Sequence, residues 1–339
     1  MRISVAPMME YTDRHYRYFV RGLVSRTVLY TEMVTTGAIL FGDKERFLAH
    51  DAVEHPLVLQ LGGDDPEACA RSVAVAETYG YDEYNLNVGC PSDKVQQAAF
   101  GACLMARPKQ VADIVAAMQR ETARPVTVKH RIGIDGRESY EELKAFVETV
   151  ASVGARRFIV HARIAVLGGL SPKQNREVPP LRYDDVYRLK ADFPELVIEA
   201  NGHIASVEEA REHLGKGLDG VMIGRAAYDN PLLLSELEEA LMEADDAKQG
   251  RLPAAGPGEP DSDLSRAAGA VRRMIPYIRA AEAEGINRYN ITKHMMGLFH
   301  GRPGARRWRR LLGDRTLSDW STEELIEEAL GAVVRPRAA

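Results

Sequence analysis

The stretch that decides the fold is LVLQLGGDDPEACARSVAVAETYGYDEYNLNVGCP, residues 57 to 91. It contains two strand-like runs, LVLQLG (57–62) and EYNLNVG (83–89). Between them, Ala68, Val73 and Ala76 recur at roughly helical spacing, and Gly80 follows as a stop signal. A strand, a helix and a second strand in this order predict a parallel βα unit.

The same alternation continues toward both ends of the chain. Further strand-like runs lie at 3–8, 28–33, 125–131, 156–162, 196–202 and 220–224, which makes eight with the two above. A second helical pattern covers 109–122. Eight strands that alternate with helices predict an α/β fold, a (β/α)8 TIM barrel over residues 1–242, and suit an open doubly wound sheet less well.

The pattern changes near residue 243. Residues 243–263, EADDAKQGRLPAAGPGEPDSD, are rich in Pro, Gly, Asp and Ala, which is typical of a linker. Beyond them only helix-like segments follow, for example at 264–285 and 322–334. We therefore expect a second, all-helical domain over 264–339.

The composition excludes several classes of protein. The chain has 339 residues, a hydrophobic content of 45%, and a net charge of −5, so any polyanion site must be local. Its three cysteines, Cys69, Cys90 and Cys103, show no CxxC spacing, which argues against a disulfide framework and a structural metal. There is no signal-like or membrane-spanning apolar stretch, so we expect a cytoplasmic protein without membrane contact.

Polar or reactive residues stand at the end of almost every predicted strand. The active site of a TIM barrel lies at the C-terminal ends of its strands, so these residues are candidates for chemistry. Each of them alone could have a purely structural role, but eight such coincidences are hard to dismiss. They are Pro7 with Met8 and Met9, Glu32, Gln60, Asn87 with Cys90, Lys129, His161 with Arg163, Asn201, and Gly224 with Arg225.

The last two strands have the features of a phosphate site. In EANGHI (199–204) and MIGRAAYDN (222–230), Gly202 and Gly224 would let backbone N–H groups approach an anion, and Arg225 could bind it. The phosphate could belong to FMN or to a sugar phosphate. Lys129 favours FMN, because an ammonium at the barrel mouth could stabilise negative charge at the N1/O2 edge of a reduced flavin.

A basic block lies in the C-terminal region. Residues 271–315 contain eleven Lys and Arg residues against three acidic ones, although a run of charge is usually only a solvated face. Here the block lies beside Trp308, Phe299 and Met295 in an otherwise acidic chain. Such a block could neutralise several phosphates of a nucleic acid.

Several motifs together resemble the tRNA-dihydrouridine synthases, specifically the bacterial A-type subfamily. They include SVAPMMEYTDRHYR, NLNVGCPSDKV, LSPKQNREVPPL, NGHI and GVMIGRAAYDNP, and the resemblance covers nearly the whole chain. It implies an FMN-containing barrel with a C-terminal helical tRNA-binding domain. The implied reaction is the NADPH-dependent reduction of the C5–C6 bond of uridine in the tRNA D-loop, at positions 20 and 20a. We expect a monomer.

The resemblance also implies roles for individual residues. Cys90 would be the proton donor to C5 of uracil, the Gly89–Pro91 turn would project it over the cleft, and Asn87 would orient the base or the flavin. The residues implied to hold FMN are Pro7, Met8, Met9, Gln60, Lys129, His161, Asn201, Gly202, His203, Gly224 and Arg225. Lys173 and Arg176 resemble the tRNA-contact loop of the A-type, and we expect Asn87 to contact the tRNA as well. From the basic block we expect contacts by Arg288, Lys293, Arg306 and Arg307.

Two positions depart from the family pattern, and two other functions compete. His203 stands where the family usually has a second glycine, and Ile164 where a basic residue is expected.

One rival is a flavin barrel that reduces a free small molecule such as a pyrimidine, against which the basic block argues. The other is a non-catalytic RNA-binding protein, against which Cys90, Lys129 and His161 argue. Retention of a cofactor and tRNA-dependent oxidation of NADPH would separate the three.

Overall fold

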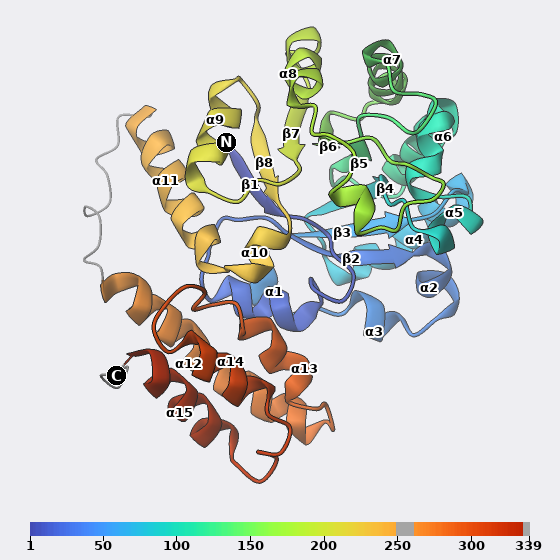
Figure 1. The fold of residues 1–339 in the computed structure, drawn as a ribbon. Coiled ribbons are helices and arrows are strands. Elements are labelled where there is room, and N and C mark those ends of the chain that lie inside the picture. Colours follow the sequence, from blue (N-terminus) through green and yellow to red (C-terminus); the bar gives the residue numbers. More distant parts are fainter. Residues whose placement is uncertain (249–260, 335–339) are drawn as a thin grey trace. The chain divides into compact units, whose positions relative to one another are not determined.

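The computed structural model describes residues 1–248 and 261–334. All eight predicted strands are present, and they form one parallel sheet surrounded by helices (Figure 1). The strands are β1 (Arg2–Val5), β2 (Leu29–Thr35), β3 (Leu57–Gly62), β4 (Glu83–Val88), β5 (Val126–Arg131), β6 (Arg157–His161), β7 (Val197–Asn201) and β8 (Gly220–Ile223).

The sheet closes on itself. The strand order is β1-β8-β7-β6-β5-β4-β3-β2, so β1 and β2 stand at the two ends of the series. A parallel bridge joins Ser4 to Val28, just before β2. Val5 N–H donates to the Val28 carbonyl, and Val28 N–H donates to the Ile3 carbonyl, both at 2.9 Å. The (β/α)8 TIM barrel predicted from the sequence is therefore confirmed.

The helices alternate with the strands as the sequence predicted. The segment expected at 66–80 is α4 (Pro66–Ala76) with a 3₁₀ turn (Glu77–Tyr79), and it stops at Gly80, which has φ 79°. The segment expected at 109–122 is α6 (Pro108–Arg120). The others up to residue 229 are α1 (Arg14–Arg21), α2 (Thr36–Phe41), α3 (Lys44–Leu48), α5 (Asp93–Gln97), α7 (Tyr140–Ala151), α8 (Tyr183–Asp192), α9 (Val207–Gly215) and α10 (Arg225–Asp229).

The remainder of the described chain is helical. It contains α11 (Leu232–Lys248), α12 (Asp261–Ala283), α13 (Tyr289–Thr292), α14 (Ala305–Gly313) and α15 (Thr322–Val334). The segment 243–263, expected to be a linker, thus has helical residues at both ends, and residues 249–260 lie outside the described part of the chain.

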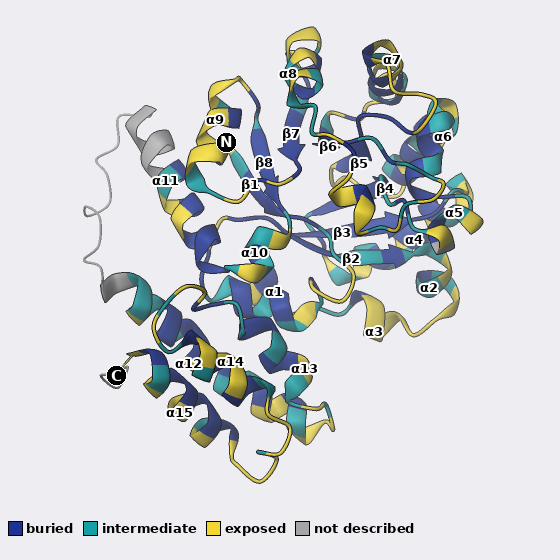
Figure 2. Ribbon diagram, in the orientation of Figure 1, coloured by how far each residue is buried: buried dark blue, intermediate teal, exposed yellow. Residues whose placement is uncertain are grey.

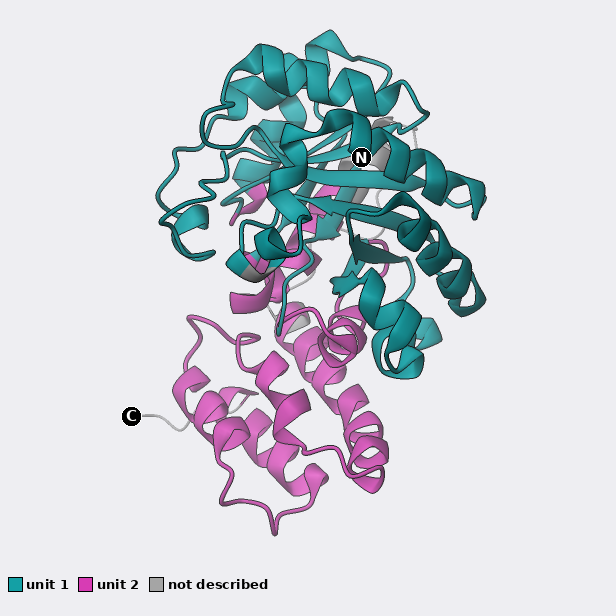
Figure 3. Ribbon diagram, turned by 90° about the vertical axis from the view of Figure 1, so that its right-hand side faces the viewer, with its two compact units in different colours: residues 1–10, 28–204, 208–224 teal, residues 11–27, 205–207, 225–339 magenta. Residues whose placement is uncertain are grey.

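The chain divides into two compact units (Figure 3). The barrel unit comprises Met1–Glu10, Val28–Ile204 and Glu208–Gly224, and the helical unit comprises Tyr11–Thr27, Ala205–Val207 and Arg225–Ala339. The predicted domain boundary at residue 242 stays a prediction. The helical unit also includes α1, which comes from the N-terminal part of the sequence. One reason is Asp13, whose carboxylate caps α1 and also contacts Nε2 of His294 at 3.0 Å.

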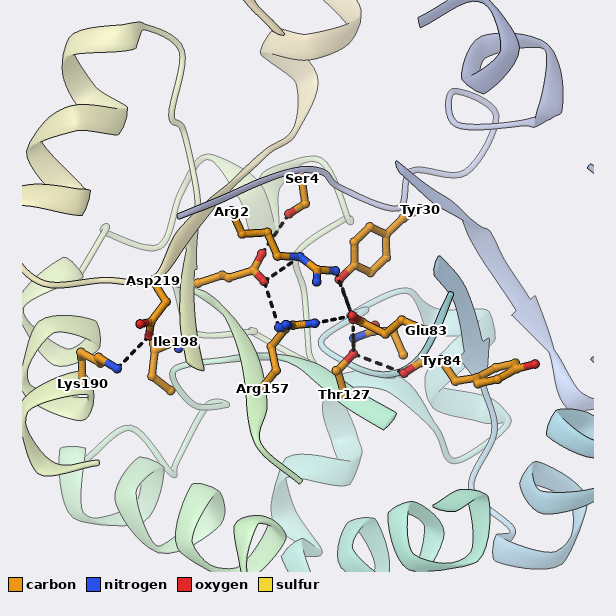
Figure 4. Close-up of polar contacts among 12 residues, drawn as sticks. Arg2, Ser4, Tyr30, Glu83, Tyr84, Thr127, Arg157, Lys190, Ile198 and Asp219 are labelled. Carbon is orange, nitrogen blue, oxygen red and sulfur yellow. Dashed lines mark hydrogen bonds and ion pairs between the residues drawn. The ribbon is translucent and has the colours of Figure 1, made fainter. Parts of the chain in front are cut away.

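The interior of the barrel contains two layers of side chains, one apolar and one charged. Ala6, Tyr30, Ile159 and Met222 belong to one buried cluster that draws on strands around the ring, and Figure 2 shows the strands as buried. The charged layer consists of Arg2, Glu83 and Arg157, which begin β1, β4 and β6, and of Glu199 in the middle of β7 (Figure 4). Burial raises the pKa of Glu199, while the two guanidinium groups oppose that effect.

Removing one charge from this layer should destabilise the fold. Glu199→Gln leaves two partly buried guanidinium groups facing one carboxylate, and removing one partner of a buried ion pair in this way typically costs about 3 kcal/mol. We expect urea denaturation to show a loss of that size in the free energy of unfolding. Glu141→Gln, which removes the partner of Arg188 in an exposed pair, should change the midpoint little. Equal effects of the two substitutions would contradict this account.

Candidate active site

The turn after β4 holds Cys90. The side chain of Asn87 points back to the turn, and its Oδ1 accepts hydrogen bonds from Gly89 N–H at 3.1 Å and Cys90 N–H at 3.0 Å. The Cys90 side chain is half-buried, and its Sγ lies 3.7 Å from Oγ of Ser92. Cys90 therefore has a fixed backbone and an accessible thiol at the C-terminal end of a barrel strand.

A second segment packs directly on this turn. The 3₁₀ helix Gly101–Ala106 begins at Gly101, which has φ 74°, and a Cβ atom there would lie 2.6 Å from the Cys90 carbonyl oxygen. Ala102 N–H donates to that same oxygen at 2.9 Å. Only glycine suits Gly101, because both the backbone conformation and the available space exclude a side chain.

The other two cysteines lie in different surroundings. Cys69 is fully buried in α4, as its helical pattern suggested, and burial raises its pKa to about 12. The Cys103 thiol lies 3.0 Å from the Phe100 carbonyl oxygen, to which it donates, and burial raises its pKa as well. Both environments disfavour a thiolate and indicate structural roles.

Lys129 and Asn201 meet across the barrel mouth. Lys129 Nζ donates to Oδ1 of Asn201 at 3.2 Å, and Nδ2 of Asn201 donates to the Met222 carbonyl at 2.8 Å. Burial, together with the charge of the neighbouring Arg131, lowers the pKa of Lys129 to about 7. Lys129 and Arg131 both interact electrostatically with Cys90, so the thiol and the two cations share one region.

His161 ends β6 in a strongly cationic environment. Desolvation lowers the pKa of His161 well below its ordinary value, and the charges of Arg131, Lys129, Arg163 and Arg176 lower it further. Its ring nitrogens have no hydrogen-bond partner among the residues that the structure describes. A neutral imidazole surrounded by four cations suits the binding of an anionic or hydrogen-bonding ligand.

The turn after β7 has an unusual backbone. Gly202 has φ 131°, and a Cβ atom there would lie 3.0 Å from Cδ2 of His161 and 3.0 Å from Cδ2 of Leu181. The next residue, His203, is exposed and has φ 56°, in the left-handed region that glycine adopts most easily. His203, which replaces the glycine usual in the family, therefore has a backbone conformation that costs free energy for any residue with a side chain. Gly224 follows β8, and Arg225 begins α10 in the helical unit.

The first and third strands place the remaining predicted residues. Pro7, Met8 and Met9 follow β1. Met8 packs on the apolar layer of the barrel, whereas Met9 is 56% exposed. Gln60 is buried on β3, where its Nε2 donates to Oδ1 of Asn85 and its Oε1 accepts from Nδ2 of Asn87, both at 2.8 Å. The Gln60 amide is therefore held between two asparagines of β4.

Sequence reasoning missed Arg131, which connects the turn after β4 with the loop between β6 and α8. Its Nε donates to the Gly89 carbonyl at 3.0 Å, and its Nη1 donates to the carbonyls of Ile164 at 2.8 Å and Asn175 at 2.9 Å. Lys129 and Arg131 are two residues apart on β5 and therefore lie on the same face, a signal that could have identified Arg131. Asn175 is buried in the SPKQNR loop, whereas Lys173 and Arg176, the residues predicted from that loop, are exposed.

The basic block of the helical unit is partly neutralised internally. Arg272, Arg279 and Arg307 form ion pairs with Glu327, Glu323 and Glu328 of α15. Arg288 donates to the Trp320 carbonyl at 2.9 Å and pairs with Glu282 at 3.1 Å. Trp308, Phe299 and Met295 are fully buried and belong to the core of the unit.

Three arginines of α14 remain exposed. Arg306, Arg309 and Arg310 make no hydrogen bond or ion pair within the residues described. Trp308, Leu311 and Leu312 face the core from the same helix, so the arginines lie on its solvent side. Lys293, at the end of α13, is half-buried.

Within the described residues, no group of three or more His, Cys, Asp or Glu side chains is arranged to hold a metal ion. No helix in this part of the chain has the length and apolar character required to span a membrane.

Comparison with known proteins gives consistent matches. A family model described as dihydrouridine synthase matches residues 4–333. The chain is 51% identical to a tRNA-dihydrouridine(20/20a) synthase of Synechocystis sp., over 97% of this chain and 94% of the relative. It is 56% identical to the protein of that name from Pseudomonas syringae pv. tomato (92% and 88% covered) and 50% identical to that of Escherichia coli K12 (99% and 92%). The chain therefore belongs to the dihydrouridine synthase family.

Proposed function

We propose that this protein reduces the C5–C6 double bond of uridine at positions 20 and 20a of the tRNA D-loop, with FMN as cofactor and NADPH as reductant. The names of the relatives support the substrate and the positions. The observation that carries the chemistry is the fixed, half-buried Cys90 beside Lys129 and Arg131 at the mouth of a TIM barrel. We further propose that the protein acts as a cytoplasmic monomer without a metal.

The residues at the mouth suit a flavin mononucleotide. Lys129 and Asn201 offer a cation and an amide to the polar edge of the ring, and the unpartnered imidazole of His161 offers a further polar contact. Met8 offers an apolar surface on the side of β1. The turns at Gly202, His203 and Gly224 would accommodate the ribityl chain and the phosphate, and we propose that Arg225 contributes to the phosphate contact. When bound, FMN supplies the hydride that reaches C6 of uracil.

Cys90 would complete the reduction by giving a proton to C5. Asn87 holds the backbone of Cys90 in place, which leaves the thiol free to point toward the base. Lys129 would stabilise negative charge at the edge of the flavin ring. The uridine must leave its stack in the tRNA to reach this site.

Binding of the tRNA would rest on exposed cations. On the barrel unit these are Lys173 and Arg176, and on the helical unit Arg306, Arg309 and Arg310 together with Lys293. Arg288 and Arg307, which the sequence also suggested, are held by partners within the helical unit, so we assign them smaller contributions. A free pyrimidine substrate would leave the exposed arginines of α14 without a function.

The two half-reactions should separate in Cys90→Ala. NADPH should reduce the bound flavin at about the wild-type rate, because that step requires no proton on uracil. Reoxidation by unmodified tRNA should be slower by about 10² to 10⁴, the usual cost of a lost general acid. Anaerobic stopped-flow at the flavin absorbance measures both rates. Cys103→Ala is the matched control and should leave both unchanged, whereas wild-type reoxidation in Cys90→Ala would refute the role of the thiol.

The exposed arginines of α14 should dominate phosphate contacts in the helical unit. Arg306→Ala combined with Arg310→Ala should weaken tRNA binding and reduce its salt slope by about one per lost contact. The matched control is Arg272→Ala with Arg279→Ala, which removes the same charge from arginines already paired with α15 and should have a smaller effect. Binding isotherms at several salt concentrations test this. Equal slopes for the two double variants would contradict it.

Binding of FMN should depend on pH through Lys129. The pKa of Lys129 is about 7, so above that pH the amine is largely neutral, and a proton must be taken up to restore the ammonium that donates to the polar edge of the flavin ring. FMN affinity should therefore fall as the pH rises from 7 toward 9. Flavin fluorescence titrations test this, and calorimetry in two buffers counts the protons. Lys129→Met should remove the pH dependence of FMN affinity. The control Lys109→Met, which changes an exposed lysine of α6, should keep it. If the pH dependence persists in Lys129→Met, Lys129 is not its source.

A further inference from the structure

A continuous chain of buried side-chain hydrogen bonds connects the base of the barrel with the Cys90 turn. Thr127 Oγ1 donates to Oε1 of Glu83 at 2.9 Å, and Nδ2 of Asn85 donates to Thr127 Oγ1 at 2.9 Å. Gln60 Nε2 then donates to Asn85, and Asn87 Nδ2 donates to Gln60, both at 2.8 Å. Asn87 in turn accepts from the N–H groups of the Cys90 turn. Each of these side chains belongs to a residue that is at most 8% exposed.

The chain has a direction, which the acceptors next to Thr127 determine. The Thr127 hydroxyl lies 2.9 Å from Oε1 of Glu83 and 3.2 Å from the Tyr84 carbonyl oxygen. Both oxygens only accept hydrogen bonds, so the hydroxyl donates on that side and is left to accept from Asn85. Because the hydroxyl accepts from the NH₂ group of Asn85, the oxygen of Asn85 faces Gln60 and accepts from its NH₂ group. The oxygen of Gln60 then faces Asn87 and accepts from the NH₂ group of Asn87. In the reversed orientation, the NH₂ group of Asn87 would face the N–H groups of Gly89 and Cys90, and buried donors would lose their acceptor.

Glu83 is itself held firmly. Arg2 Nη2 donates to its Oε2 at 2.9 Å, Arg157 donates to the same oxygen, and the Tyr30 hydroxyl lies 3.4 Å from Oε1 (Figure 4). Both oxygens therefore face donors, so Glu83 cannot turn without breaking several contacts.

We propose that Glu83 and Thr127 are positioning residues for Cys90, which act through the amides of Asn85, Gln60 and Asn87. They fix the orientation of the Asn87 amide and thereby the conformation of the turn that carries the thiol. The conformational part of this inference is independent of the reaction. Its catalytic consequence rests on the proposed role of Cys90 as proton donor.

The test is a pair of substitutions at Thr127. Thr127→Val keeps the shape of the side chain but removes the hydroxyl, which frees the amides to reverse, whereas Thr127→Ser keeps the hydroxyl. Amide hydrogen exchange at Gly89 and Cys90, measured by NMR on the protein without tRNA, should be about tenfold faster in Thr127→Val than in wild type. Thr127→Ser should exchange nearly as slowly as wild type. Reoxidation of the flavin by tRNA should slow in Thr127→Val, while reduction by NADPH should not.

The control is Thr292→Val in α13. The Thr292 hydroxyl is also buried and donates only to a backbone carbonyl, that of Leu312, at 3.1 Å. Thr292→Val should lower stability without changing exchange at Gly89 or Cys90. If Thr127→Val does not fold, Asn85→Ala interrupts the same chain one step nearer the turn and should give the same local increase.

Two results would overturn the proposal. The first is that amide exchange at Gly89 and Cys90 is unchanged in Thr127→Val. The second is that exchange becomes faster by the same factor throughout the barrel strands, which would mean that the hydrogen-bond chain contributes only to overall stability. Absence of dihydrouridine formation by the wild-type protein would instead contradict the proposed function. The exchange experiment would still decide the conformational inference in that case.

Discussion

The ion cluster of Arg2, Glu83, Arg157 and Glu199 is the constraint on which the rest of the barrel depends. Two carboxylates and two guanidinium groups enclosed by a barrel are tolerable only when each charge meets its counterpart. They come from four different strands, so the cluster requires one particular register of those strands. A shift of one residue would turn a charged side chain out of the barrel and leave its partners unpaired.

That register also places the residues at the mouth. On β4, Glu83 and Asn87 lie on one face, and on β6 Arg157 and His161 do so, because side chains alternate along a strand. The pairing of Asn87 with Lys129 and of His161 with Asn201 between neighbouring strands then brings the polar residues together. On β4 and β6 the charged cluster thus lies at one end of the strand and the candidate site residues at the other.

Sequence patterns predicted the parts of the structure that depend on local spacing. All eight strands were recognised, because each is a short apolar run bounded by turn residues. The pairing of Arg272 and Arg307 could not be predicted, since it depends on how α15 packs against the helices before it. Arg131 was missed for a similar reason, because its partners are backbone carbonyls of two loops whose proximity appears only in the folded chain. His203 was recognised as a departure, but its left-handed backbone was not.

Some arginines of the helical unit are paired with carboxylates and others are not, and this difference affects how a polyanion would approach. The whole chain carries a net charge of −5, so at a distance it repels nucleic acid weakly. Screening limits that repulsion to about 8 Å at physiological ionic strength, within which single groups dominate. There the carboxylates of α15 form ion pairs with Arg272, Arg279 and Arg307, whereas Arg306, Arg309 and Arg310 on the solvent side of α14 form no ion pair within the described residues. The attractive field is therefore narrow and directional, and it favours encounters in one orientation over indiscriminate adsorption of RNA.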